Sequence, residues 1–139
     1  MLRYLLDTNI VSEPLRLQPD EHILRQLQAH GEECAIASPV WHELWFGCRQ
    51  LPPSARRSKI EHYLTHVIHP SLMILPYDAQ AAAWHATERA RLKASGRVPP
   101  FVDGEIAAVA ATQNLTLVTL NEADYMHFVG LSLENWRNA

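Results

Sequence analysis

Short apolar runs alternate with segments of helical periodicity along this chain. The apolar runs predict buried strands, because each is short and bounded by turn or cap residues. They cover residues 2–6, 34–37, 72–75 and 115–120, and a last short edge strand is expected at 131–133. Between them, the spacing of apolar positions and the cap residues predict helices. One helix begins at Thr8–Asn9, and the others cover residues 20–30, 38–51, 55–66, 78–94 and 103–112. This alternation predicts an α/β fold with a central, mainly parallel sheet of four to five strands and helices on both faces.

Length and composition favour one globular domain over residues 1–139. The chain has 139 residues, of which 47% are hydrophobic and 19% are charged, and it shows no internal repeat or linker. No apolar run approaches the roughly 20 residues of a membrane span, and an acid interrupts the apolar N-terminal stretch where a secretion signal would continue. The two cysteines, Cys34 and Cys48, are too few for a disulfide framework. We therefore expect a cytoplasmic protein with reduced thiols and no membrane contact.

The charge balance argues against nucleic-acid binding by bulk charge alone, because the formal net charge is −3. A cluster of acids in one site can nevertheless mask basic surface elsewhere. One basic stretch has no intervening acid, and it contains Arg49, Arg56, Arg57 and Lys59. This stretch is either a solvated helix face or a surface that contacts phosphates.

Acidic and polar side chains follow the predicted strands. Asp7 comes directly after the first strand, Thr119, Asn121 and Asp124 follow the fourth, and Asp103 opens a helix after a Pro-Pro turn. Parallel sheets place their sites beyond the carboxyl ends of the strands, near a switch in strand order. Taken singly, Asp7 and Asp103 could each cap a helix and Asp124 could be a turn residue. Together they predict a site.

Glu43 is harder to explain as a structural residue, because it lies inside a predicted helix. Its neighbours at helical spacing include Val40 and Phe46, so its carboxylate is expected along a mostly apolar face. Several acids at one end of a sheet would repel each other unless a divalent cation lies among them. Mg²⁺ and Mn²⁺ prefer oxygen ligands, and a metal held by carboxylates can promote hydrolysis of a phosphodiester.

At these positions the sequence resembles the PIN-domain proteins of the VapC type, the toxins of bacterial toxin–antitoxin pairs. Four blocks match the family in order over almost the whole chain, namely YLLDTNIVSE, SPVWHELWFG, DGEIAAVAA and LTLVTLNEADYMHF. The resemblance implies a PIN-like three-layer α/β/α domain. It also implies a Mg²⁺-dependent endoribonuclease of the bacterial cytoplasm, in which Mn²⁺ can substitute. The implied partners are an RNA substrate, a second copy in a homodimer, and a VapB-like antitoxin whose tail enters the active site.

The resemblance also assigns roles to individual residues. Asp7 and Asp103 would be metal ligands, and Glu43 would complete the acidic pocket. Relatives have the fourth acid at either of two positions, occupied here by Asn121 and Asp124, so Asp124 is the fourth catalytic candidate and Asn121 a polar neighbour. The supporting residues would be Thr8, Asn9, Thr119 and Asn121. The RNA-binding residues would come from the basic stretch.

Three other interpretations stay open at this stage. The first is a PIN-like domain that is catalytically weak or inactive and binds RNA or a protein partner. This alternative stays open because Asn121 is an amide at a position where relatives can have an acid. The weakest is a flavodoxin-like regulatory domain that merely binds Mg²⁺ at Asp7 and its neighbours, and the absence of any lysine after Lys93 counts against it. His62 and His66 stand four residues apart on a predicted helix, a spacing that can bind zinc. No glutamate follows His62 in the zinc-protease pattern, so exposed or edge-packed histidines are the favoured interpretation. The four tryptophans are expected to serve packing more than base stacking.

Overall fold

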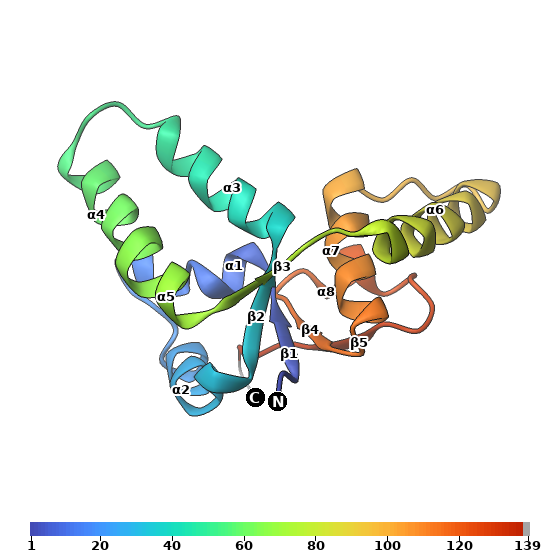
Figure 1. Ribbon diagram of the computed structural model, residues 1–139, viewed down its shortest axis with the longest axis horizontal. Coiled ribbons are helices and arrows are strands. Elements are labelled where there is room, and N and C mark those ends of the chain that lie inside the picture. Colours follow the sequence, from blue (N-terminus) through green and yellow to red (C-terminus); the bar gives the residue numbers. More distant parts are fainter. Residues whose placement is uncertain (138–139) are drawn as a thin grey trace.

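Five parallel strands form one sheet in the computed structural model, which describes residues 1–137 (Figure 1). The strands are β1 (Tyr4–Leu6), β2 (Cys34–Ala37), β3 (Met73–Leu75), β4 (Thr116–Val118) and β5 (Ser132–Glu134). Their order in the sheet is β3-β2-β1-β4-β5, and every neighbouring pair runs parallel. The expected α/β class is confirmed, with five strands. The single-domain prediction for 1–139 includes residues 138–139, which lie outside the described part.

Helices cover both faces of this sheet and complete a three-layer α/β/α arrangement. In Figure 1, α3, α4 and α5 lie on one side of the strands and α6 and α7 on the other. The helical segments are α1 (Thr8–Val11), η1 (Glu13–Leu15), α2 (Glu21–His30), η2 (Gly31–Glu33), α3 (Ser38–Arg49), α4 (Ala55–Tyr63), η3 (Leu64–Ile68), α5 (His69–Ser71), α6 (Ala79–Ala94), α7 (Phe101–Thr112) and α8 (Glu122–Tyr125). None of the helices within residues 1–137 has the length and apolar character needed to cross a membrane.

The helix caps follow the sequence closely. Asp20 and Asp78 each accept a hydrogen bond from a backbone N–H three residues later, at the starts of α2 and α6. Gly96 follows the end of α6 with a φ of 82°, a left-handed conformation that glycine adopts without a steric cost. These local signals fix the start of α2 and both ends of α6.

The predicted helix over residues 55–66 is wrong at its C-terminal end, because the chain stays helical up to Ser71. After α4 it widens into the π-helical turn η3, and it then continues into α5. Pro70 is compatible with this continuation, since it occupies one of the first two positions of α5, where no backbone N–H is required. Leu64 and Ile68, at the two ends of this turn, are both buried.

The hydrophobic core surrounds the central strand, β1. It includes Trp136 and both cysteines, which were expected to be structural residues. Leu5, Leu6 and Leu117 are fully buried, and Trp136 is 2% exposed with its ring edge-on to Tyr4. Both cysteines are buried and free, as expected. Since β2 and β3 extend the sheet on one side of β1 and β4 and β5 on the other, the strand order switches between β1 and β4. The carboxyl ends of these two strands are the place where a site is expected.

Candidate active site

Asp7 leaves the end of β1 and points into the switch point. Its Oδ1 accepts the backbone N–H of Thr8 at 2.8 Å, which makes Asp7 the N-cap of α1. Its Oδ2 accepts the hydroxyl of Thr119, just beyond β4, at 2.8 Å. The side chain is 6% exposed, and burial raises the pKa of this carboxyl above its ordinary value. Asp7 therefore caps α1 and faces the candidate site at the same time.

Glu43 approaches the same place from α3. The Thr8 hydroxyl donates to Glu43 Oε2 at 3.0 Å, which joins the start of α1 to the middle of α3. The expected apolar surroundings are only half correct, because Val40 is fully buried but Phe46 is 56% exposed. Glu43 is half-buried at the boundary between core and solvent. A carboxylate at such a boundary can keep its charge and still face a buried neighbour.

Asp103 reaches the site from the first turn of α7. The prediction that it opens this helix is wrong by two residues, since α7 begins at Phe101, directly after Pro100, whose fixed φ precedes the first helical residue. Asp103 therefore makes no side-chain cap bond there. Burial, together with the charges of Asp7, Asp124 and Glu43, raises the pKa of Asp103 to about 6. This coupling indicates that the four acids share one electrostatic site.

Tyr125 joins two of these acids and was not singled out as a functional residue from the sequence. Its hydroxyl donates to Asp7 Oδ2 at 3.2 Å and to Asp103 Oδ1 at 3.4 Å. Burial and the charges of Asp7 and Asp103 raise the pKa of this phenol far above its ordinary value, so the hydroxyl stays protonated and remains a donor. The only signal in the sequence was its place as the aromatic residue after Asp124 in the fourth block.

The loop after β4 carries the remaining polar candidates. Asn9 Oδ1 accepts the backbone N–H of Leu120 at 3.3 Å, and the backbone N–H of Asn121 donates to the Thr119 hydroxyl at 3.0 Å. The side chains of Asn121 and Asp124 are both exposed. Asp124 is the one that carries a charge, and this charge raises the pKa of both Asp7 and Asp103, so it stays the candidate for the fourth acid. Asn9 and Thr119 hold the loop.

The carboxylates suit a divalent cation held largely by water. Neither Asp7 nor Asp103 owes its pKa to a neighbouring Lys or Arg, and no hydrogen bond from the described residues reaches Asp103 Oδ2. Within residues 1–137, no group of three His, Cys, Asp or Glu side chains forms a ready metal cage. Mg²⁺ matches such a site, since it keeps several waters and binds through one or two carboxylates.

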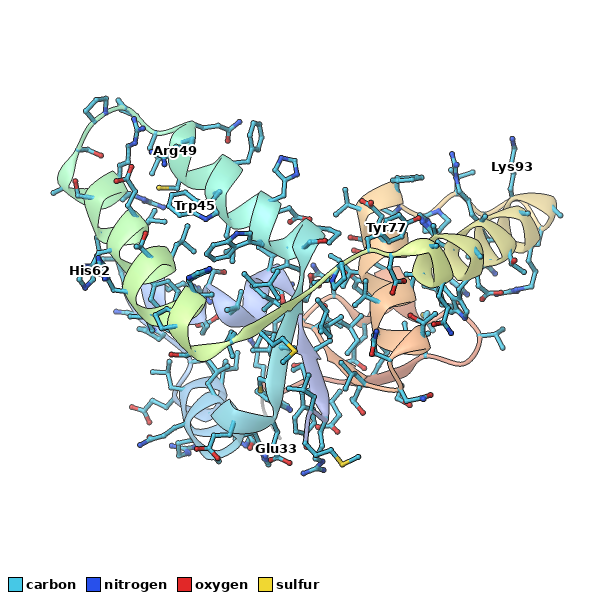
Figure 2. The ribbon with its side chains drawn as sticks, viewed as in Figure 1. Glu33, Trp45, Arg49, His62, Tyr77 and Lys93 are labelled. Carbon is cyan, nitrogen blue, oxygen red and sulfur yellow. The ribbon has the colours of Figure 1, made fainter. Side chains whose placement is uncertain are left out.

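The basic stretch lies at the far end of α3 and in α4. Figure 2 shows Arg49 at the end of α3 that points away from the strands. Glu61 neutralises part of the stretch, because its Oε1 lies 3.0 Å from Arg49 Nη1 and 3.3 Å from Arg57 Nε. Arg56 and Lys59 are exposed on α4 and have no ion pair within the described residues. These two keep their charge available for phosphates.

One hollow with a mostly apolar lining lies apart from the acids. It has a volume of about 910 Å³ and opens between α2 and η3, where Leu27, Tyr63 and Ile68 line it. None of the candidate site residues lines this hollow. A smaller hollow of about 260 Å³ includes Asp124. The acidic site is therefore recognised by its converging polar groups and not by its size.

The comparisons with known proteins agree with this geometry. The PIN domain model matches residues 4–126. The chain is 32% identical over 138 residues to the VapC ribonuclease Y4jK of Sinorhizobium fredii, covering 96% of this chain and 98% of that protein. A solved structure of FitAB bound to an IR36 DNA fragment superimposes with a TM-score of 0.89 at 28% identity, over 98% of this chain and 97% of that one. Another, VapBC-5 of Mycobacterium tuberculosis from the VapBC family of toxin–antitoxin systems, gives a TM-score of 0.71 at 27% identity, over 99% of each chain. The chain belongs to the PIN-domain family, among its VapC-type members.

Proposed function

We propose that this chain is a metal-dependent endoribonuclease of the bacterial cytoplasm, the toxin of a toxin–antitoxin pair that a VapB-like antitoxin inhibits. The observation that carries the proposal is the convergence of Asp7 and Asp103 on the Tyr125 hydroxyl, at 3.2 and 3.4 Å, where burial and neighbouring acids raise the pKa of Asp103 to about 6. A cluster that repels itself in this way is suited to a cation and to a phosphate bound beside it. The names of the relatives support RNA as the substrate and an antitoxin as the partner.

Asp7 and Asp103 are the residues that would hold the cation. When Mg²⁺ is bound, it supplies neutralisation of phosphate charge and a lowered pKa of a coordinated water, and Mn²⁺ can supply the same chemistry. Thr8, Thr119 and Tyr125 keep the Asp7 carboxylate in one orientation through three hydrogen bonds. The chain thus provides an ordered pair of carboxylates before any ligand enters.

Glu43 and Asp124 are the residues that would transfer protons. Glu43 is half-buried, and one of its oxygens accepts the Thr8 hydroxyl. Asp124 is exposed in α8, one residue before Tyr125. Either carboxylate would be placed to accept the proton of the water that attacks phosphorus, since both lie near enough to Asp103 for their charges to raise its pKa. Asp124, the more exposed of the two, would also be able to pass that proton to solvent.

Metal removal tests the proposal directly. The purified, antitoxin-free protein is incubated with total cellular RNA in Mg²⁺ or Mn²⁺ and, in parallel, in EDTA, beside Asp103→Ala. We expect discrete products with either metal, none in EDTA, and none from the variant. A folded wild-type protein that binds RNA but never cleaves it with either metal would favour the binding-only alternative.

Arg56 and Lys59 are expected to bind the RNA strand through its phosphates. The double variant Arg56→Ala/Lys59→Ala should weaken RNA binding more at low salt than at high salt. It should also reduce the slope of log K against log salt by about 1.4, since each contact to a single strand contributes about 0.7. Fluorescence anisotropy with a labelled RNA across a salt series measures both effects. Arg25→Ala is the matched control, because it removes an exposed charge from α2, where it pairs with Glu21, and an equal effect of this control would exclude a specific role for α4.

We also propose that the active form is a homodimer, in keeping with the family resemblance. Sedimentation equilibrium of the antitoxin-free chain should then give twice the 15.8 kDa of one copy. A single species at the monomer mass across micromolar concentrations would contradict this.

A further inference from the structure

The Tyr125 hydroxyl lies between the two innermost acids of the site. Tyr125 ends α8 and is 1% exposed, with its ring centroid 6.5 Å from that of Phe128. Its single proton is shared between carboxylates from β1 and α7, at 3.2 Å from Asp7 and 3.4 Å from Asp103. No other side chain in the described residues donates to both of these acids.

The hydrogen bonds leave a defined set of carboxylate oxygens open. Asp7 Oδ2 accepts both the Thr119 and the Tyr125 hydroxyls, which occupies its two lone pairs, whereas Oδ1 accepts only one backbone N–H. Asp103 Oδ1 accepts Tyr125, and no donor among the described residues reaches its Oδ2. One lone pair therefore remains on Asp7 Oδ1 and one on Asp103 Oδ1, and both remain on Asp103 Oδ2. Asp7 Oδ1 and Asp103 Oδ2 are the two oxygens that Tyr125 leaves without a contact.

We propose that Tyr125 is a positioning residue that orients Asp7 and Asp103 for a divalent cation through its hydroxyl. The inference rests on the proposed metal-dependent function and adds to it a residue that does not itself bind the metal. Groups that hydrogen-bond to metal ligands fix the orientation of those ligands, and their loss typically weakens metal binding about 10- to 100-fold. A phenylalanine would fill the same space in the core without holding either carboxylate.

Tyr125→Phe tests the hydroxyl alone. Mn²⁺ binding to the antitoxin-free full chain is measured without RNA, from the electron paramagnetic resonance signal of free Mn²⁺. We expect the Kd for Mn²⁺ to rise about 10- to 100-fold in the variant. In RNA cleavage, the half-saturating Mg²⁺ concentration should rise by a similar factor.

Tyr63→Phe is the matched control, because it removes the hydroxyl of a partly buried tyrosine. That hydroxyl donates to the backbone oxygen of Val11 at 2.7 Å and touches none of the four acids. The control variant is expected to lose thermal stability while its Kd for Mn²⁺ is unchanged. A merely structural role for Tyr125 would make the two variants behave alike.

Three results would overturn the proposal. An unchanged Kd for Mn²⁺ in Tyr125→Phe would show that the hydroxyl does not orient the ligands, and tighter binding would show that it obstructs the cation. Absence of Mn²⁺ binding to the wild-type protein would remove the site itself. Because binding is measured without RNA, a wild-type protein that binds Mn²⁺ but leaves RNA intact would contradict the proposed nuclease function and leave the positioning role supported.

Discussion

Asp103→Asn is expected to reduce RNA cleavage in Mg²⁺ by at least about 100-fold while raising the thermal stability of the metal-free protein. Losing a proposed metal ligand should cost no less than losing a group that merely orients one. The gain in stability follows from the repulsion at this position, where burial and three neighbouring acids raise the pKa of Asp103 to about 6. An amide of the same shape keeps the packing and removes the charge. We expect a rise in Tm of about 2–5 °C in EDTA at pH 8.

The pH dependence of this gain has a definite sign. The folded state raises the pKa of Asp103 from its ordinary 3.8 to about 6, so folding holds a proton that the unfolded chain would release. Asp103 therefore costs no stability below about pH 4. The cost grows as the pH rises toward 6 and is complete above it. The difference in Tm between Asp103→Asn and wild type should be largest at pH 8 and vanish near pH 4.

Thermal melts in EDTA at both pH values, together with cleavage assays in Mg²⁺, check both halves of this prediction. Asp20→Asn is the control, because Asp20 caps α2 away from the acidic site. This control should keep cleavage and gain no stability at pH 8. A lower Tm for Asp103→Asn at both pH values would show that the carboxylate is a net stabilising group in the metal-free fold.

The sequence alone located the acids because their signals are local. Asp7 follows a run of buried residues, and the parallel sheet places the ends of its strands at one edge. The approximate position of Asp103 was equally clear, although α7 starts two residues earlier than expected. Strand ends and helix starts are encoded by neighbours within a few residues, which is why they could be predicted.

Contacts between distant segments could not be predicted in the same way. The bonds from Tyr125 to Asp7 and Asp103 join residues 118 and 22 positions apart, and no local pattern specifies them. The pairing of Glu61 with Arg49 and Arg57 likewise depends on how α4 folds back beside α3. The π-helical turn η3 was missed because its apolar spacing resembles that of an ordinary helix.

Gly104→Ala is expected to destabilise the fold by about 1–3 kcal/mol, the usual cost of forcing extra volume into a packed contact. A Cβ at this position of α7 would overlap the imidazole ring of His85 in α6, with Cδ2 at 2.6 Å. That ring has little room to move. His85 is 3% exposed, its Nδ1 lies 2.9 Å from the Tyr77 hydroxyl, and its centroid lies 4.7 Å from that of Phe101. Cleavage should fall as well, because Asp103 is the preceding residue on the displaced helix.

Two further variants distinguish this clash from a general effect of alanine in a helix. Gly47→Ala is the matched control in α3, where a Cβ meets nothing within 4 Å, so it should be neutral or stabilise by up to about 1 kcal/mol. His85→Ala removes the ring that the added methyl group would strike. Urea unfolding of both single variants and of the double variant His85→Ala/Gly104→Ala should show a loss in the double variant smaller than the sum of the two. Additive losses would mean that the glycine is required for a reason other than the contact between α6 and α7. A sub-additive result would identify the clash with His85 as the cause of the destabilisation.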